Sequence, residues 1–177
     1  MDRRGVRGEG YGGVGSRFVV VVTAVLVGLA FLAVPAQAYP GYKQIKNQEQ
    51  PWFSGPVCLE IEGSARLAPG EVEWCSYDTI AEQWTAVAIP EAPGYYQLKN
   101  LKADSTALCL EVSGGLYADG TATVMNSCNS TAWNQQWRFI PVGSWYEVVV
   151  RHSGKCLTNT GWKALQYNCD GASRQHW

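Results

Sequence analysis

The chain has 177 residues, of which 14 are Lys or Arg and 15 are Asp or Glu, so its formal net charge is −1 at pH 7. A protein that binds nucleic acid through its phosphates needs a basic face, and this charge balance argues against such a partner. Only two His are present, which leaves little material for acid–base catalysis or a metal centre, and no cofactor motif is recognised.

The first 38 residues have the pattern of a secretory signal peptide. Arg residues precede an apolar run of 17 residues from Phe18 to Val34, and a small-x-small cleavage site follows at Ala36 and Ala38. We therefore expect residues 1–38 to be removed and the protein to be secreted. An uncleaved anchor is the alternative, because the run lies at the lower edge of what spans a bilayer. In that case this segment alone would contact the membrane.

The exported part, residues 39–177, is the size of one domain. It has 177 − 38 = 139 residues, enough to bury roughly two thirds of the unfolded surface. Removing four Arg, one Asp and one Glu leaves 10 basic and 13 acidic residues, a net charge of −3. A second domain does not fit into this length.

All six cysteines lie in the exported part, and an even number in an exported chain indicates three disulfides. Neighbour pairing gives three short loops with separations of 17, 19 and 13 residues, which join Cys58 to Cys75, Cys109 to Cys128 and Cys156 to Cys169. Each loop is worth about 3 kcal/mol in the chain-entropy model. A zinc site is the competing interpretation, but the sequence has no C-x2-C pair.

Three short phrases recur in the same order. The first cysteine of each pair opens "CLEIEG", "CLEVSG" or "CLTNTG", and a Trp follows the second cysteine by 9, 9 and 8 residues, at Trp84, Trp137 and Trp177. Upstream, "GYKQIKN" and "GYYQLKN" are offset by 53 residues, and "SWYEVVV" holds the same place in the last repeat. The exported part therefore consists of three repeats.

Within each repeat the pattern is that of β-structure. Short alternating or apolar runs such as "ALCLEV" and "QQWRFI" are separated by Gly, Asn, Asp and Ser, and no stretch keeps a helical period. Four strands in each of three repeats give twelve strands, and closing them around a threefold axis removes exposed sheet edges. The predicted fold is all-β, a β-trefoil.

These residues resemble the ricin B-type lectin family, in the secreted bacterial form with a Cys-Leu-acid-aliphatic phrase, a second cysteine and a closing Gln-x-Trp. The closest copy runs from Cys109 through Cys128 to Trp137. The resemblance covers residues 39–177 and implies a trefoil lectin domain with one disulfide in each repeat. The last repeat ends at Trp177, without the residues that normally follow as its closing strand.

Each repeat closes with a triplet that ends in Trp, at residues 82–84, 135–137 and 175–177. We expect the Trp of each triplet to pack in the core, where a large ring buries much area. The triplet Gln is expected to fix a turn by hydrogen bonding. The motif thus identifies a fold and does not by itself establish a function.

The resemblance implies a small sugar site on each repeat, in which a carboxylate takes two hydroxyls, a ring stacks on the pyranose and an Asn completes the contacts. In repeat 1, Glu60 holds the acid position and Trp74 is the candidate ring, but Ala81 replaces the Asn. A solvated charge at a strand end is the alternative for both Glu60 and Glu111.

Repeat 2 keeps most of the pattern. Glu111 holds the acid position, and Asn134 and Gln135 fit, but Asn126 stands where the ring is expected. Trp133 is the preferred substitute for that ring, and packing against the disulfide loop of the same repeat is the alternative for Trp133.

In repeat 3, Tyr167 fits the ring position, while Thr158 replaces the acid and Arg174 replaces the Asn. Further rings in expected loops could serve as exposed platforms, namely Tyr117, Trp145 and Trp162.

The leading prediction is a secreted, non-catalytic module that binds a neutral glycan weakly, with a galactose-containing glycan or a polysaccharide such as xylan as the candidate ligand. The alternative is a trefoil interaction or cell-surface protein, or a protease inhibitor, that has lost sugar binding. An enzyme is disfavoured, because glycosidases need paired carboxylates and nothing places Glu60 and Glu111 across one cleft.

Overall fold

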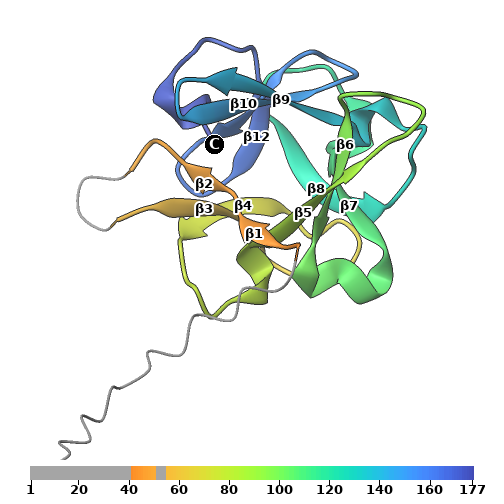
Figure 1. Ribbon diagram of the computed structural model, residues 1–177, viewed down its shortest axis with the longest axis horizontal. Helices are drawn as coiled ribbons and strands as arrows, with labels where there is room; N and C mark the ends of the chain where they lie inside the picture. Colours follow the sequence, from red (N-terminus) through yellow and green to blue (C-terminus); the bar gives the residue numbers. More distant parts are fainter. Residues whose placement is uncertain (1–40, 51–54) are drawn as a thin grey trace, which may run out of the picture. The chain divides into compact units, whose positions relative to one another are not determined.

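The computed structural model describes residues 41–50 and 55–177 (Figure 1). The predicted signal segment, residues 1–38, lies outside these residues. Within the described part of the chain, no helix is long and apolar enough to cross a membrane.

The strands follow the three repeats. Repeat 1 has a first strand in two pieces and three further strands: β1 (Lys43–Gln44), β2 (Lys46–Asn47), β3 (Val57–Ile61), β4 (Gly70–Trp74) and β5 (Gln83–Ala88). Repeat 2 has four strands: β6 (Tyr96–Asn100), β7 (Leu108–Val112), β8 (Thr121–Ser127) and β9 (Trp137–Val142). Repeat 3 has three: β10 (Trp145–Val150), β11 (Cys156–Asn159) and β12 (Ala164–Tyr167).

Five short 3-10 helices connect these strands: η1 (Ile80–Glu82), η2 (Leu101–Thr106), η3 (Ser113–Gly115), η4 (Trp133–Gln135) and η5 (Ser173–Gln175). Three of them, η1, η4 and η5, occupy the same place in each repeat, and each ends two residues before the Trp of its triplet. The repeat pattern of the sequence is therefore also a repeat pattern of the backbone.

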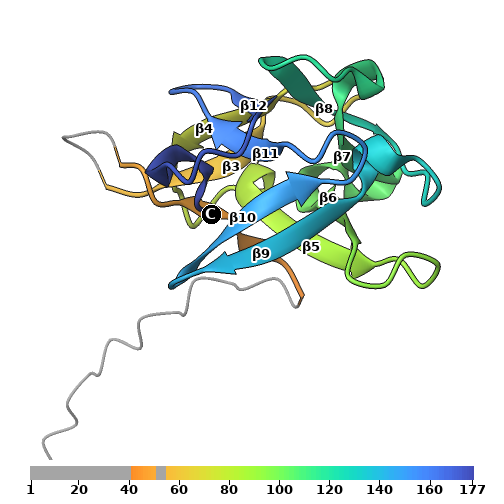
Figure 2. The same ribbon diagram turned by 90° about the horizontal axis from the view of Figure 1, so that it is seen from above.

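All strand pairings are antiparallel and follow one scheme. The second and third strands of each repeat form a hairpin, in the pairs β3–β4, β7–β8 and β11–β12. The fourth strand of one repeat pairs with the first strand of the next, in the pairs β5–β6 and β9–β10 (Figure 2). Two shorter pairings, β1–β5 and β6–β9, join the strands within repeats 1 and 2. This is the predicted trefoil arrangement.

The triplet Trp residues lie in the core, as predicted. Their exposed fractions are 2%, 0% and 6% for Trp84, Trp137 and Trp177. Each indole Nε1 donates a hydrogen bond to the carbonyl oxygen of the Leu in the Cys-Leu phrase of its own repeat, at 2.8, 2.9 and 2.9 Å. The spacing of phrase and Trp is therefore fixed by one contact that occurs three times.

The turn-forming role predicted for the triplet Gln is confirmed in two repeats. Gln135 accepts from the backbone N–H of Asn129 at 2.8 Å and donates to the carbonyl of Ser127 at 2.9 Å. In repeat 3, Gln175 makes the same two contacts with the backbone of Asp170 and Asn168. Both side chains thereby hold the turn that follows the second cysteine.

The predicted disulfides are confirmed. The bonds Cys58–Cys75, Cys109–Cys128 and Cys156–Cys169 join Cα atoms 5.0, 4.9 and 5.1 Å apart. Each bond lies within one repeat, and no described cysteine is free. The zinc alternative is therefore excluded for these sulfur atoms.

The described residues form the twelve strands that were expected, but these are not divided equally, because repeat 1 has five and repeat 3 has three. The first strand of repeat 1 is split into β1 and β2, and the fourth strand of repeat 3 is represented only by His176 and Trp177. Trp177 exchanges two backbone hydrogen bonds with Tyr146, at 2.9 and 2.8 Å. Among the described residues, no strand covers the edge of β1 that faces away from β5.

Candidate functional site

Repeat 2 brings together the acid and the amide that the sequence singles out. The carboxylate of Glu111, on β7, accepts from Asn126 Nδ2 on β8 and from Gln135 Nε2 in η4, both at 2.9 Å. Glu111 is only 5% exposed, so the alternative of a solvated strand-end charge is wrong for this residue. Asn126, which stands where a ring was expected, fills that place with a polar contact.

Two neighbours extend this cluster. Arg66, in the loop between β3 and β4, donates from Nε to Asn126 Oδ1 at 2.7 Å. Asn134 donates from Nδ2 to the carbonyl of Val112 at 2.9 Å, so its amide is fixed beside the end of β7. Arg66 was not expected from the sequence, because it belongs to repeat 1 and reaches repeat 2 only in the folded chain.

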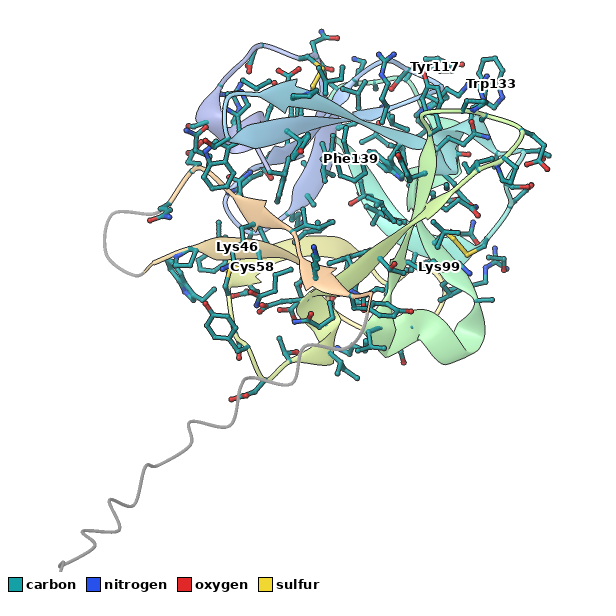
Figure 3. All side chains as sticks on the ribbon, viewed as in Figure 1. Lys46, Cys58, Lys99, Tyr117, Trp133 and Phe139 are labelled. Atoms are coloured by element: carbon teal, nitrogen blue, oxygen red, sulfur yellow. A yellow bond between two sulfur atoms is a disulfide. The ribbon has the colours of Figure 1, made fainter. Side chains whose placement is uncertain are left out.

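The substitute ring of repeat 2 is exposed. Trp133 is 55% exposed, and the guanidinium of Arg151 lies 4.3 Å from its ring centroid and 4.9 Å from that of Tyr95. Arg151 also donates to Gln136 Oε1 at 2.6 Å. Trp133 is labelled at the periphery of the domain in Figure 3, as is Tyr117, which is 66% exposed. The ring thus has one side against a cation and remains accessible to solvent.

Repeat 1 does not assemble the same set. Trp74 packs against the hydrophobic core, and Ala81 is buried without a polar group. Glu60 is half-buried and lies opposite Glu71 on β4. Burial raises the pKa of Glu60, Lys102 lowers it in part, and the carboxylates of Glu73 and Glu71 raise it further. The candidate ring of this repeat therefore serves the core.

Glu82 occupies the place in repeat 1 that Gln135 holds in repeat 2. It is 1% exposed and accepts from the backbone N–H of Ser76, at 2.8 and 3.0 Å, and from Gln44 Nε2, at 2.7 Å. Burial raises the pKa of Glu82 to about 7, against the lowering effect of these hydrogen bonds, and the charges of Glu60 and Glu73 raise it further. The signal was present in the sequence, because the first triplet begins with Glu and not with Gln.

Repeat 3 offers a ring without a carboxylate at the expected place. Thr158 is 1% exposed, donates to the carbonyl of Cys156 at 3.0 Å and accepts from Gln175 Nε2 at 3.0 Å. Arg174, in the Asn position, forms an ion pair with Asp170. Tyr167 is half-buried, and its hydroxyl lies 3.2 Å from where a side chain on Gly120 would begin.

A carboxylate from repeat 2 lies close to this ring. Asp119 accepts from the backbone and side-chain N–H groups of Asn168, at 3.0 and 3.2 Å, and forms an ion pair with Lys155. The hydrogen bond from Lys155 lowers the pKa of Asp119. This pair could not be predicted from the sequence, because its members lie 36 residues apart.

Comparison with known proteins fits the fold and the repeat pattern. Residues 80–166 match the family described as ricin-type beta-trefoil lectin domain-like. Over these residues the chain matches a ricin-type β-trefoil lectin domain. No curated protein sequence matches it.

Solved structures with the same fold include a designed threefold-symmetric protein, ThreeFoil. This chain is 28% identical to ThreeFoil with a TM-score of 0.64, and the match covers 77% of this chain and 94% of ThreeFoil. A Polyporus squamosus lectin bound to a sialylated epitope matches at 14% identity and a TM-score of 0.61, over 79% of this chain and 49% of that one. An exo-beta-1,3-galactanase from Clostridium thermocellum matches at 21% identity and a TM-score of 0.58, over 77% of this chain and 29% of that one. These last two likenesses concern the fold alone, and in both the trefoil is part of a longer chain.

Proposed function

We propose that residues 39–177 form a secreted, non-catalytic module that binds a neutral glycan weakly through repeat 2. The observation that carries this proposal is the Glu111 carboxylate, which two amide side chains hold at 2.9 Å. A carboxylate in a fixed orientation retains lone pairs for further donors and forms charge-assisted hydrogen bonds with neighbouring hydroxyls of a sugar.

Two further features support the same site. Asn134 is fixed next to Gln135, where an amide would complete the polar contacts, and Trp133 offers an exposed ring for the C–H face of a pyranose. Glu60 with Trp74 in repeat 1, and Tyr167 in repeat 3, remain secondary candidates, because each lacks part of the set. A galactose-containing glycan or a polysaccharide is the proposed ligand class. A single shallow site suggests a dissociation constant near millimolar, about −4 kcal/mol.

Secretion is part of the proposal. Three disulfides suit an oxidising compartment, and residues 1–38 are proposed as the signal peptide that leads there. N-terminal sequencing of the exported protein should begin at Tyr39. A mature protein that starts near residue 1 would instead support a retained anchor.

A glycan array with residues 39–177 identifies the ligand, and calorimetric titration of two variants then tests the site. Glu111→Gln should weaken binding by about one to two powers of ten, because a hydrogen bond to a charged group is worth roughly 1.5–3 kcal/mol. Thr158→Ala, at the same place in the repeat that has no acid, should leave binding unchanged. If Thr158→Ala abolishes binding while Glu111→Gln retains it, the assignment to repeat 2 is wrong.

The ring is tested separately. Trp133→Ala should weaken binding to the same glycan by about fivefold, because ring stacking is worth about 1 kcal/mol. Trp162→Ala is the matched control, since Trp162 in repeat 3 is equally exposed, at 62%. Equal losses for the two variants would show that Trp133 is not the platform.

A further inference from the structure

Two guanidinium groups and two aromatic rings meet where repeats 2 and 3 join. The guanidinium of Arg151 lies 4.3 Å from the ring centroid of Trp133 and 4.9 Å from that of Tyr95. The guanidinium of Arg138 lies 5.8 Å from the same Tyr95 centroid. Trp133 is 55% exposed, and Figure 3 labels it at the periphery of the domain. We call these four residues the Arg–ring cluster.

The backbone places both Arg side chains on one face of the β9–β10 hairpin. Arg138 lies opposite Val149, and the N–H of Arg151 donates to the carbonyl of Gln136 at 2.8 Å. Alternate residues of a strand face the same side, so Arg138 and Arg151 project in the same direction. Figure 1 shows that β6, which directly follows Tyr95, lies beside β9. The cluster is therefore positioned by regular strands.

The side chain of Arg151 is held in a fixed orientation. Its Nη1 donates to Gln136 Oε1 at 2.6 Å, and Gln136 is only 2% exposed. Gln136 is fixed in turn, because its Nε2 donates to the carbonyl of Ser130 at 2.6 Å. A guanidinium has five N–H donors in one plane, and contacts with aromatic rings use none of them. Arg151 is thus preorganised and keeps donors for a further acceptor.

No carboxylate neutralises the two cations. In the described part of the chain, the basic residues in ion pairs are Lys155 and Arg174, and neither Arg138 nor Arg151 takes part in one. Glu147 lies on the same face of β10, but its carboxylate is within 4.8 Å of both sulfur atoms of the repeat 3 disulfide. Two neighbouring guanidinium groups without a carboxylate form a complementary surface for an oxyanion.

We propose that the Arg–ring cluster binds the acidic group, a carboxylate or a sulfate, of a glycan. The anion accepts from the free donors of Arg151, and Arg138 supplies the second positive charge. Trp133 belongs both to this cluster and to the proposed sugar site, so the ligand has a neutral residue at Glu111 and an acidic residue beside it. That the anion belongs to a glycan rests on the proposed function, whereas the contact of an anion with two Arg side chains does not.

Three small probes test the proposal on residues 39–177 by NMR titration at constant ionic strength. D-galacturonate should shift the side-chain Nε–H signals of Arg138 and Arg151 in a saturable way. D-galactose has CH2OH in place of the carboxylate and should leave these two signals unchanged at the same concentrations. Sodium acetate has the carboxylate without the sugar ring. It should bind at least about fivefold more weakly than galacturonate, because it cannot stack on Trp133.

Three variants locate the anion. Arg138→Gln and Arg151→Gln should each weaken galacturonate binding at least about tenfold, because each removes a cation that faces the carboxylate. Lys163→Gln is the matched control, since it removes the same charge from an exposed position of repeat 3 and should leave the affinity unchanged. Circular dichroism checks that each variant is folded. Arg138 is exposed, so Arg138→Gln tests the proposal even if Arg151→Gln, which loses the bond to Gln136, does not fold.

Three results would each overturn the proposal. They are unchanged Arg138 and Arg151 signals in galacturonate, equal affinities for galacturonate and acetate, and equal losses for Arg138→Gln and Lys163→Gln. Failure of the proposed sugar site gives a different result. In that case Glu111→Gln has no effect on the best glycan of the array, while galacturonate still shifts the two Arg signals, and this outcome supports the Arg–ring cluster independently.

Discussion

The Trp of each triplet contributes to stability in two ways, through burial of its ring and through a hydrogen bond from its indole N–H. Trp137 is fully buried and also donates to the carbonyl of Leu110 at 2.9 Å. A Phe at this place would keep most of the apolar burial but would leave a buried carbonyl without its partner. The indole N–H therefore explains why Trp, and not any large ring, recurs in all three repeats.

Trp137→Phe should lower the free energy of unfolding by about 1–3 kcal/mol, the usual cost of an unsatisfied buried group. Urea denaturation followed by circular dichroism measures the loss. Trp162→Phe, at an exposed ring, should change stability by less than about 0.5 kcal/mol and is the control. A loss of the same small size for both would mean that the hydrogen bond contributes nothing.

Glu82→Gln tests the acid that replaces Gln in the first triplet. Because the folded-state pKa of Glu82 is raised from 4.5 to about 7, the folded protein holds a proton that the unfolded chain has released between these pH values. The free energy of unfolding should therefore fall as pH rises from about 4.5 to 7, and the loss should be complete above 7. Glu82→Gln removes this contribution and should be the more stable protein at pH 8.

Thermal melts of the two proteins from pH 4 to pH 9 measure this difference. The charges of Glu60 and Glu73 act on Glu82, and both residues remain in the two proteins. The difference between the two curves of melting temperature against pH therefore reports on position 82 alone. Gln135→Glu is the reverse change in repeat 2, beside Glu111, and should create a similar loss of stability above neutral pH. Parallel curves for the original protein and Glu82→Gln would contradict the raised pKa.

At the residue scale, local spacing predicted the cysteine partners and the buried Trp side chains, because each depends on contacts within one repeat. It could not predict that Arg66 binds Asn126 or that Arg151 lies over Trp133. Arg66 and Arg151 come from neighbouring repeats, and no local pattern encodes which loops meet. The sequence therefore indicates the acid and the amide of the candidate site, and only the folded chain shows which side chains surround them.

At the scale of the elements, the three repeats meet through the beginnings of their third strands. Gly70 on β4 lies against Thr123 on β8, whose hydroxyl donates to the carbonyl of Ala164 on β12 at 2.7 Å. A side chain on Gly70 would begin 2.3 Å from Thr123 Oγ1. The smallest residue is required because the neighbouring repeat fills the space.

Gly70→Ala should therefore destabilise the protein by about 1–3 kcal/mol, as overpacking in a core does. The double variant Gly70→Ala with Thr123→Ala removes the clashing hydroxyl, so its loss should be smaller than the sum of the two single losses. Urea denaturation of the four proteins completes the cycle. Additive losses would show that the two positions are not in contact.

The order and type of these elements could be predicted, because short runs between turn residues are a local property. The split of the first strand into β1 and β2 could not. The carbonyl of Ile45 accepts from the N–H of Leu59 at 2.9 Å, so the strand leaves β5 at this residue and turns toward β3. Such a switch depends on two partner strands that are distant in sequence.

At the scale of the whole domain, one core position is less buried than its equivalents in the other two repeats. Ile45, Leu98 and Val148 hold the same position in the first strands of the three repeats, and Leu98 and Val148 are buried, whereas Ile45 is only partly buried. Leu98 lies opposite Ala86 of β5, and Val148 lies opposite Phe139 of β9. Among the described residues, no strand lies opposite Ile45 in the same way. A strand similar to β9 at this place should therefore stabilise residues 39–177.

Extending residues 39–177 after Trp177 by residues 138–142 of β9, with Glu in place of Arg at the first position, should cover Ile45. Burying Ile45 and one large apolar side chain of the added segment should raise the free energy of unfolding by about 1–3 kcal/mol. The melting temperature should then rise by about 3–10 °C for a domain of this size, as measured by circular dichroism. A Gly/Ser tail of equal length is the control and should leave the melting temperature unchanged. Equal melting temperatures for the two extended proteins would show that the added strand does not pack over Ile45.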